Sequence, residues 1–155
     1  MAENIAKNSI EYYMDKYERP VRALSSYLNW LEEHMNVRTD SVYSDSETVM
    51  PFPIYDSTLM AFIKQVQNTG ILDRNCVYLY TRRRINGVKD ELDFIEKARL
   101  QDMDDLWAVL SNYVIEGMSR GAKWSEGVSS GIFYHVIRKM LDLLITWSRS
   151  VPPKG

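Results

Sequence analysis

Residues 113–147 read YVIEGMSRGAKWSEGVSSGIFYHVIRKMLDLLITW, and this stretch decides the expected fold. It contains two apolar segments of helical periodicity, joined by a connector with glycine at positions 117, 121, 127 and 131. Glycine is unfavourable inside helices because it loses the most backbone freedom on folding, so four glycines between two core helices indicate a specific, tight geometry. Residues 132–147 have a wide apolar stripe at helical spacing. We therefore expect the last helix to be the centre of a helical core. The members of the stripe are Phe133, Val136, Ile137, Met140, Leu141, Leu144 and Trp147.

The first 50 residues predict an N-terminal helical hairpin over 1–35 and a polar linker over 36–50. Apolar side chains recur at helical spacing on both sides of Arg19-Pro20. Proline is tolerated at the first position of a helix, where its missing N–H needs no partner, so we expect a helix break here and a second helix over 21–35. Serine, aspartate and threonine dominate the linker, which has no helical pattern.

Residues 51–147 are expected to form the main helical domain, and residues 148–155 a tail. The first helix of this domain is predicted over 58–69 and ends at Gly70, because glycine commonly follows the end of a helix. Three aspartates precede the next strongly apolar helix, which is predicted to end near Met118, and carboxylates there are favourable against the positive end of the helix dipole. These aspartates are Asp102, Asp104 and Asp105.

The segment 76–85 allows two interpretations. Its valine, tyrosines and isoleucine would suit a strand, and Asn86-Gly87 is typical of a hairpin turn. However, residues 89–98 carry charges at helical spacing, so no partner strand follows. We therefore favour a helical segment over 76–85 and predict an all-α protein, a single compact domain of about six to seven helices.

Composition restricts the possible functions. The 155 residues are 45% hydrophobic and 26% charged, with a net charge of −2, which argues against a general affinity for nucleic acid. The single cysteine, Cys76, cannot form an internal disulfide or a cysteine zinc site. No apolar run approaches the length of a membrane span, and the N-terminus has no secretory signal. We expect a cytoplasmic protein with no membrane association.

A family resemblance covers roughly residues 50–144. Three features carry it: an acidic stretch before the penultimate helix, a short connector with arginine, an aromatic residue and glycine, and a glycine–apolar–phenylalanine start of the last helix. In these features the chain resembles a family of small all-helical bacterial and phage proteins, which is catalogued only as a domain of unknown function. Tryptophan stands where that family usually has phenylalanine. The resemblance implies a compact helical domain and carries over no catalytic residues. The matching positions are Arg120, Trp124, Gly127, Gly131, Ile132 and Phe133.

Metal binding and acid–base catalysis find little support in the sequence. The two histidines, His34 and His135, do not form a helical ligand pair. The cluster of three aspartates lacks the glycine-containing loop of calcium sites, and helix capping explains it more simply. We therefore predict no metal site, no cofactor and no catalytic residue.

Two candidate binding sites remain. Arginines interleaved with tyrosines can contact phosphates and stack on bases, so one hypothesis is a nucleic-acid-binding patch. Its residues are Tyr78, Tyr80, Arg82, Arg83 and Arg84.

The second candidate is the glycine-rich connector, as a site for a partner or an anion near a helix start. The alternative is that Trp124 fills the core while the glycines let helices approach closely. The residues of this candidate site are Arg120, Gly121, Lys123, Trp124 and Gly127.

Abundant tyrosine, methionine and tryptophan favour an interaction protein. We expect a non-catalytic binding or regulatory protein of a bacterium, phage or mobile element that binds a protein partner or self-associates. A nucleic-acid-associated factor is the first alternative. A small enzyme or anion-binding site around Arg120, Trp124 and His135 is the second.

Overall fold

The computed structural model describes residues 2–35, 57–120 and 122–150, which form helices and contain no strand. The predicted all-α fold, a single compact helical domain, is therefore confirmed. The predicted linker over 36–50, Gly121 and residues 151–155 of the tail lie outside the described residues. The elements in chain order are α1 (Ala2–Leu24), η1 (Ser25–Tyr27), α2 (Leu28–His34), α4 (Ser57–Gln67), α5 (Val77–Arg83), α6 (Val88–Lys97), η2 (Leu100–Asp102), α7 (Met103–Ser119), α8 (Ala122–Ser129) and α9 (Ile132–Ser150).

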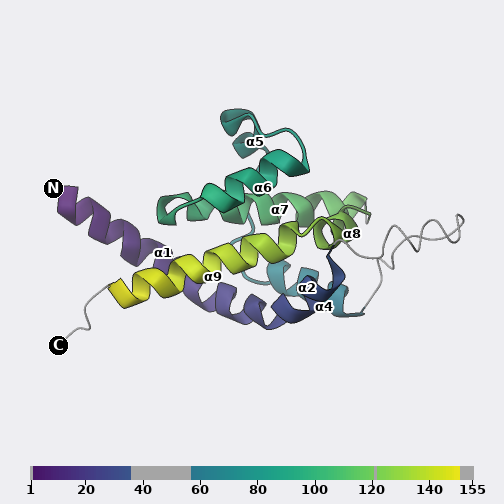
Figure 1. Ribbon diagram of the computed structural model, residues 1–155, viewed down its shortest axis with the longest axis horizontal. Helices are drawn as coiled ribbons and strands as arrows, with labels where there is room; N and C mark the ends of the chain where they lie inside the picture. The colour runs from purple at the N-terminus through teal and green to yellow at the C-terminus, as the bar shows by residue number, and fades with distance from the viewer. Residues whose placement is uncertain (1, 36–56, 121, 151–155) are drawn as a thin grey trace, which may run out of the picture.

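Helix α9 is the centre of the structure, as expected from its apolar stripe. It contacts α1, α2, α6, α7 and α8, and it crosses the middle of the molecule in Figure 1. Its side chains Val136, Ile137 and Met140 are fully buried. An aromatic cluster lies at its start, where the ring of Phe133 is 5.0 Å from that of Phe62 and 5.9 Å from that of Tyr113. The core is therefore built from helices far apart in the sequence.

The helix break predicted at Arg19-Pro20 is wrong. Pro20 lies inside α1, which continues to Leu24. The segments α1, η1 and α2 then follow one curved path along the molecule in Figure 1 and do not fold back as a hairpin. The reason is tertiary packing: Tyr17, Val21 and Leu24 form one buried stripe across the proline. Burial of this stripe offsets the loss of one backbone hydrogen bond.

Two glycines bracket the segment that contains α5. Gly70, which follows α4, and Gly87, which precedes α6, both have positive φ, at 82° and 93°. The first main-domain helix ends at Gln67, two residues before the predicted end, and a turn leads from it to Gly70. Residues 77–83 form helix α5, so the helical interpretation of this segment is also confirmed. Gly87 provides a turn between two helices instead of a hairpin turn between strands.

The glycine-rich connector contains a further helix, α8, which the sequence did not predict. Gly117 lies inside α7 and Gly127 inside α8, and both are buried. A Cβ atom on residue 127 would lie 2.6 Å from ring carbons of Phe133, so α8 can approach α9 only because this position is glycine. Glycine thus lets an aromatic ring lie directly against the backbone of α7 and of α8, the tight geometry that the glycine content indicated.

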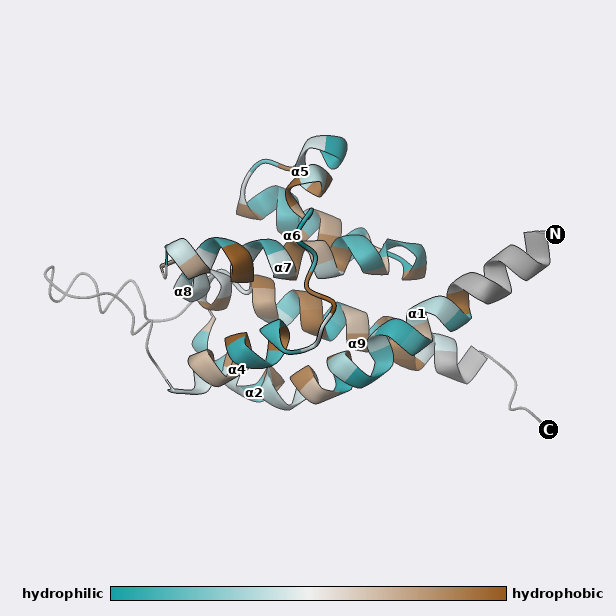
Figure 2. Cartoon of the chain, turned by 180° about the vertical axis from the view of Figure 1, so that it is seen from behind, coloured by the Kyte–Doolittle hydropathy of each residue, from teal (hydrophilic) through white to brown (hydrophobic). Residues whose placement is uncertain are grey.

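The surface helices have one buried face and one polar face. Figure 2 shows α1 and α4 as alternating hydrophilic and hydrophobic segments along the ribbon, the pattern of helices with one buried side. Within the described part of the chain, no helix combines the length and the apolar character that crossing a membrane requires.

Candidate interaction surface on helix α5

Helix α5 lies at the edge of the molecule, packed against α7 (Figure 1). Helical spacing divides its residues into two faces. Leu79 is buried on the inner face, and the Cys76 thiol at the start of the helix lies 3.8 Å from the Oδ1 atom of Asn112. Burial raises the pKa of this thiol to about 11, so it stays protonated at neutral pH. The outer face carries Val77, Tyr78, Thr81 and Arg82, all of them exposed.

The outer face has an unusual concentration of exposed apolar side chains. Val77 is 57% exposed and its neighbour Tyr78 is 65% exposed. The other large hydrophobic side chains that are exposed in the described residues, Tyr12 and Met118, lie apart in sequence on α1 and α7. Single exposed apolar residues are normal, but two neighbours on one short helix form a small apolar patch. We call the exposed residues Val77, Tyr78, Arg82 and Arg84 the α5 face.

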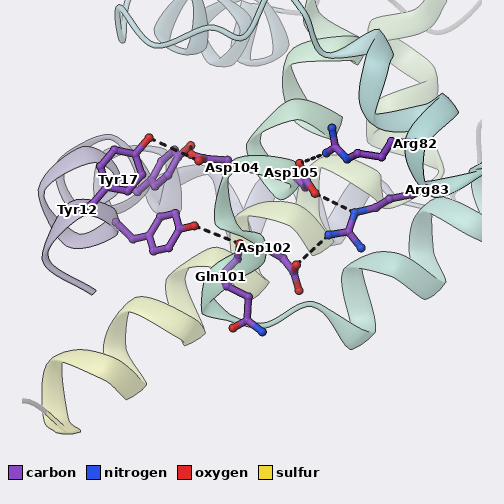
Figure 3. Close-up of polar contacts among 9 residues, drawn as sticks. Tyr12, Tyr17, Arg82, Arg83, Gln101, Asp102, Asp104 and Asp105 are labelled. Atoms are coloured by element: carbon purple, nitrogen blue, oxygen red, sulfur yellow. Dashed lines mark hydrogen bonds and ion pairs between the residues drawn. The ribbon is translucent and has the colours of Figure 1, made fainter. Parts of the chain in front are cut away.

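The three consecutive arginines of this region have different environments. Arg82 forms one ion pair, in which its Nη2 atom lies 2.7 Å from Oδ1 of Asp105. Arg83 donates from Nε to Asp105 at 2.8 Å and from Nη2 to Asp102 at 2.9 Å (Figure 3). Its guanidinium also stacks 4.6 Å from the ring centroid of Phe94. Two of the three charges are therefore paired with aspartates at the start of α7.

Asp104 is directed toward α1 instead of α5 (Figure 3). Its carboxylate accepts a hydrogen bond from the hydroxyl of Tyr17 and forms an ion pair with Lys16, whose Nζ atom lies 3.2 Å from Oδ1 of Asp104. Burial and the neighbouring Asp104 raise the pKa of Tyr17. The aspartates predicted to stabilise the start of α7 thus also fasten α1 and α5 to it.

Arg84 is exposed and has a left-handed backbone conformation, with φ 57° and ψ 46°. It occupies the position that follows the last residue of α5. The N–H of Arg84 donates to Thr81 O at 3.3 Å, and the N–H of Ile85 donates to Tyr80 O at 2.9 Å. These two bonds define a Schellman motif, in which glycine is the preferred residue at this position. Arginine is therefore an unexpected choice here.

A buried carboxylate fastens the inner side of α5. Glu91 of α6 is only 3% exposed and accepts hydrogen bonds of 2.6 Å from the hydroxyls of both Tyr80 and Tyr113. Burial raises the pKa of Glu91 above its ordinary value of 4.5, against the lowering effect of the two hydroxyls. The same burial raises the pKa of both tyrosines. This cluster joins α5, α6 and α7.

The cluster also joins residues from both candidate sites of the sequence analysis. Tyr80 belongs to the arginine–tyrosine candidate, and Lys123 to the connector candidate. The Nζ atom of Lys123 lies 4.4 Å from the ring centroid of Tyr113 and 3.4 Å from Glu116, and its charge lowers the pKa of Glu91. The structure thus brings these two residues to one polar cluster, which sequence reasoning did not find. Glu91 gave no separate signal, because in sequence it is one of several acids on a charged helix.

Packing explains two of the remaining residues of the connector candidate, Trp124 and Gly127. The indole N–H of Trp124 donates to Val114 O at 2.9 Å, and the ring covers Gly117. Gly127 is buried against Phe133. Arg120 is exposed at the end of α7. Packing against Trp124 and Phe133 therefore accounts for Gly117 and Gly127.

His135 lines a shallow cavity of about 370 Å³ between α6 and α9. The other residues of its lining are Leu92, Ile95, Glu96, Arg138, Lys139 and Asp142. Arg120 and Trp124 are not among them, so this cavity does not bring His135 together with the two connector residues. Among the residues that the structure describes, no three histidine, cysteine or acidic side chains are grouped as metal ligands.

Comparison with protein-family models, with curated proteins and with solved structures finds no match to this chain. The resemblance to a family of small helical bacterial and phage proteins therefore stays a prediction. The function has to be inferred from the geometry described above.

Proposed function

We propose that this protein is a non-catalytic binding module that contacts another protein through the α5 face. The observation that carries the proposal is the exposure of two neighbouring apolar side chains, Val77 and Tyr78, on one short helix. Tyrosine and arginine are the residues that most often dominate binding energy at protein interfaces, and Arg82 follows Tyr78 by one helical turn. An apolar centre with a polar rim is the usual composition of such an interface.

The attachment of α5 to the body also supports the proposal. The inner side of the helix is fastened by the hydrogen bond from Tyr80 to Glu91, and its end by the two contacts of Arg83. A helix held in this way has little conformational entropy left to lose on binding. The α5 face is thus presented in a fixed geometry, which favours affinity for a partner of complementary shape.

Photo-crosslinking tests the proposal. A benzoylphenylalanine at position 78, incorporated in the full chain and expressed in the source cell, should capture a protein partner. The same residue at position 64, which is exposed on α4, serves as the matched control. A discrete protein adduct at position 78 that is absent at 64 and survives nuclease treatment supports the proposal. Equal labelling at both positions, or none, would contradict it.

A nucleic-acid-associated function is the second candidate. Residues 74–89 contain five basic side chains and no acidic one, in a chain with a net charge of −2. Against it, Arg82 and Arg83 are paired with Asp102 and Asp105, which weakens their attraction for phosphate. Loss of every adduct on nuclease treatment, together with salt-sensitive retardation of single-stranded nucleic acid, would favour this candidate.

We place this activity in the cytoplasm of a bacterium, or in a cell that carries a phage or mobile element. The origin follows from the family resemblance of residues 50–144. The compartment is favoured by the lone thiol of Cys76, which lies buried and has no second cysteine with which to pair. Fractionation of source cells with an antibody against the protein checks the compartment.

A further inference from the structure

We propose that the partner presents an acidic segment with one apolar side chain, and that Arg84 selects it by binding a carboxylate. This inference rests on the proposed function, because it names the chemistry of the partner that the α5 face would bind. In this proposal the apolar side chain of the partner contacts Val77 and Tyr78, and its carboxylate binds the arginine at the end of the same helix.

The first argument is charge complementarity. Residues 74–89 carry five basic and no acidic side chains. Arg82 and Arg83 are paired with aspartates of α7. The other three, Arg74, Arg84 and Lys89, are exposed and have no ion pair with any residue in the described ranges. Of these three, Arg84 belongs to the α5 face, which therefore offers a cation that is available to an acidic partner.

The second argument is the backbone of Arg84. Its left-handed conformation is one that glycine adopts without strain and that an arginine adopts at a cost. Its side chain is exposed, so packing in the core does not explain the choice. A requirement of the fold alone would favour glycine at position 84. The presence of arginine there indicates that the side chain itself serves a purpose, and strained residues of this kind concentrate at binding sites.

The adjacent cavity does not explain Arg84 equally well. This cavity of about 360 Å³ between the end of α5 and α6 is lined by Arg84 and Lys97, but also by Asp90 and Asp93. Opposite charges in its lining give no preference for an anion. The α5 face has no exposed acid of its own between residues 74 and 89, so we assign carboxylate recognition to that face.

The geometry of α5 sets the spacing that the partner needs. Tyr78 and Arg84 are six residues apart, which corresponds to about 9 Å along a helix axis. A polyproline II chain rises about 3.1 Å per residue and has three residues per turn, so residues three apart lie on the same side about 9 Å from each other. A partner segment in this conformation would therefore place its carboxylate three residues from its apolar side chain.

Synthetic peptides test the inference. The probe is a fluorescein-labelled, proline-rich 12-residue peptide in the polyproline II conformation, with one leucine and a glutamate three residues away. It is titrated with the full chain and followed by anisotropy. The matched control peptide has glutamine in place of the glutamate. We expect the wild-type chain to bind the glutamate peptide about tenfold more tightly, as for one charge-assisted hydrogen bond. Equal binding of the two peptides would overturn the inference.

Arg84→Gly separates recognition from folding. Glycine suits the left-handed position, so the variant should melt at the same temperature as wild type or higher, while its preference for glutamate over glutamine disappears. Lys64→Ala, which removes an exposed charge on α4, should keep the preference. A retained preference in Arg84→Gly would overturn the inference, as would its loss in Lys64→Ala.

The same variants distinguish this inference from the function on which it rests. The crosslinker at position 78 is compared in the wild-type chain and in Arg84→Gly. If both capture a protein equally well, the proposed binding module stands and the proposal of an acidic partner is wrong. Absence of any protein adduct at position 78 removes both. A single-stranded oligonucleotide and the unlabelled glutamate peptide are also compared as competitors of the labelled peptide. If the oligonucleotide displaces the labelled peptide at the lower concentration, the ligand of the α5 face is nucleic acid and not an acidic protein.

Discussion

The indole ring of Trp124 covers Gly117, so that a Cβ atom on residue 117 would overlap the ring. The ring is held there by the hydrogen bond from its N–H to Val114 O, 2.9 Å long. Helix α7 therefore needs glycine at this position for reasons of space, although the backbone there is ordinary helix. The contact joins α8 to α7, and it turns a residue that disfavours helices into one that the packing requires.

Gly117→Ala should destabilise the protein by about 2 kcal/mol. Alanine gains up to about 1 kcal/mol in helix propensity, but forcing a methyl group against a fixed ring costs about 1–3 kcal/mol or more. Urea unfolding followed by circular dichroism measures the change. In the background Trp124→Ala, the same substitution should become neutral or stabilising. An equal loss in both backgrounds would show that the ring is not the cause.

Glu91 should make stability depend on pH in a specific direction. Its pKa in the folded protein is raised above 4.5, so the folded state keeps a proton that the unfolded state releases. The contribution of Glu91 protonation to the free energy of unfolding is complete below pH 4.5, and it is lost as the pH rises through the pKa of Glu91 in the folded protein. Relative to Glu91→Gln, the free energy of unfolding of the wild type should therefore fall as pH is raised from 4.5 toward neutrality.

Urea titrations of both proteins at steps between pH 4 and pH 8 measure this difference, and subtraction removes the titration of the other groups. Glu91→Ala provides the structural control. It leaves the hydroxyls of Tyr80 and Tyr113 without their acceptor, so it should cost about 2–4 kcal/mol throughout this range. A difference between wild type and Glu91→Gln that rises with pH would contradict the assignment.

Arg83→Lys should loosen α5 while leaving the core intact. Lysine keeps the charge, but it cannot contact Asp102 and Asp105 together in the same fork, and it loses the planar stack on Phe94. We expect a global loss of about 1 kcal/mol and faster amide hydrogen exchange in residues 77–85, with exchange in α9 unchanged. Arg82→Lys loses a single, more exposed contact and should have a smaller effect.

Pro20→Ala should stabilise the protein. A proline in a helix interior costs about 3 kcal/mol, of which roughly 1 kcal/mol is offset because proline also restricts the unfolded chain. Since Pro20 lies within α1, we expect a net gain of about 1–2 kcal/mol in thermal or urea unfolding. The exposed Arg19→Ala substitution is the control and should be nearly neutral. Destabilisation by Pro20→Ala would mean that the proline ring makes a packing contribution of its own.

Helical periodicity predicted most of the fold because the periodic stripes are the faces that become buried. The buried positions of α9 follow from its local pattern, whereas the helix expected to stop at Gly70 ends three residues earlier, at Gln67. Pro20 was misread because its local preference for the start of a helix was outweighed by a buried stripe that continues from Tyr17 to Leu24. Local sequence rules take account of the proline, but they contain no information on the residues from other helices against which the stripe packs.

The candidate site was only partly predictable. The run Arg82–Arg84 looks uniform in sequence, but its members differ because Asp102 and Asp105, some twenty residues away, face two of them. Glu91 looked like a surface acid because the two tyrosines that bury it come from other helices. Exposure of Val77 was hidden for the same reason, since a short apolar run does not reveal which side faces the body.

Gly70 and Gly87, the two turns of positive φ, enclose a segment whose inward contacts and outward contacts use different residues. Leu79, Tyr80 and Arg83 attach the segment to the body, whereas Val77 and Tyr78 point away from it. The residues that attach the segment to the body are thus separate from those that face outward. We therefore expect the outward residues to tolerate substitution without a change of fold, so that new binding specificities can be engineered on this scaffold by substituting only a few positions.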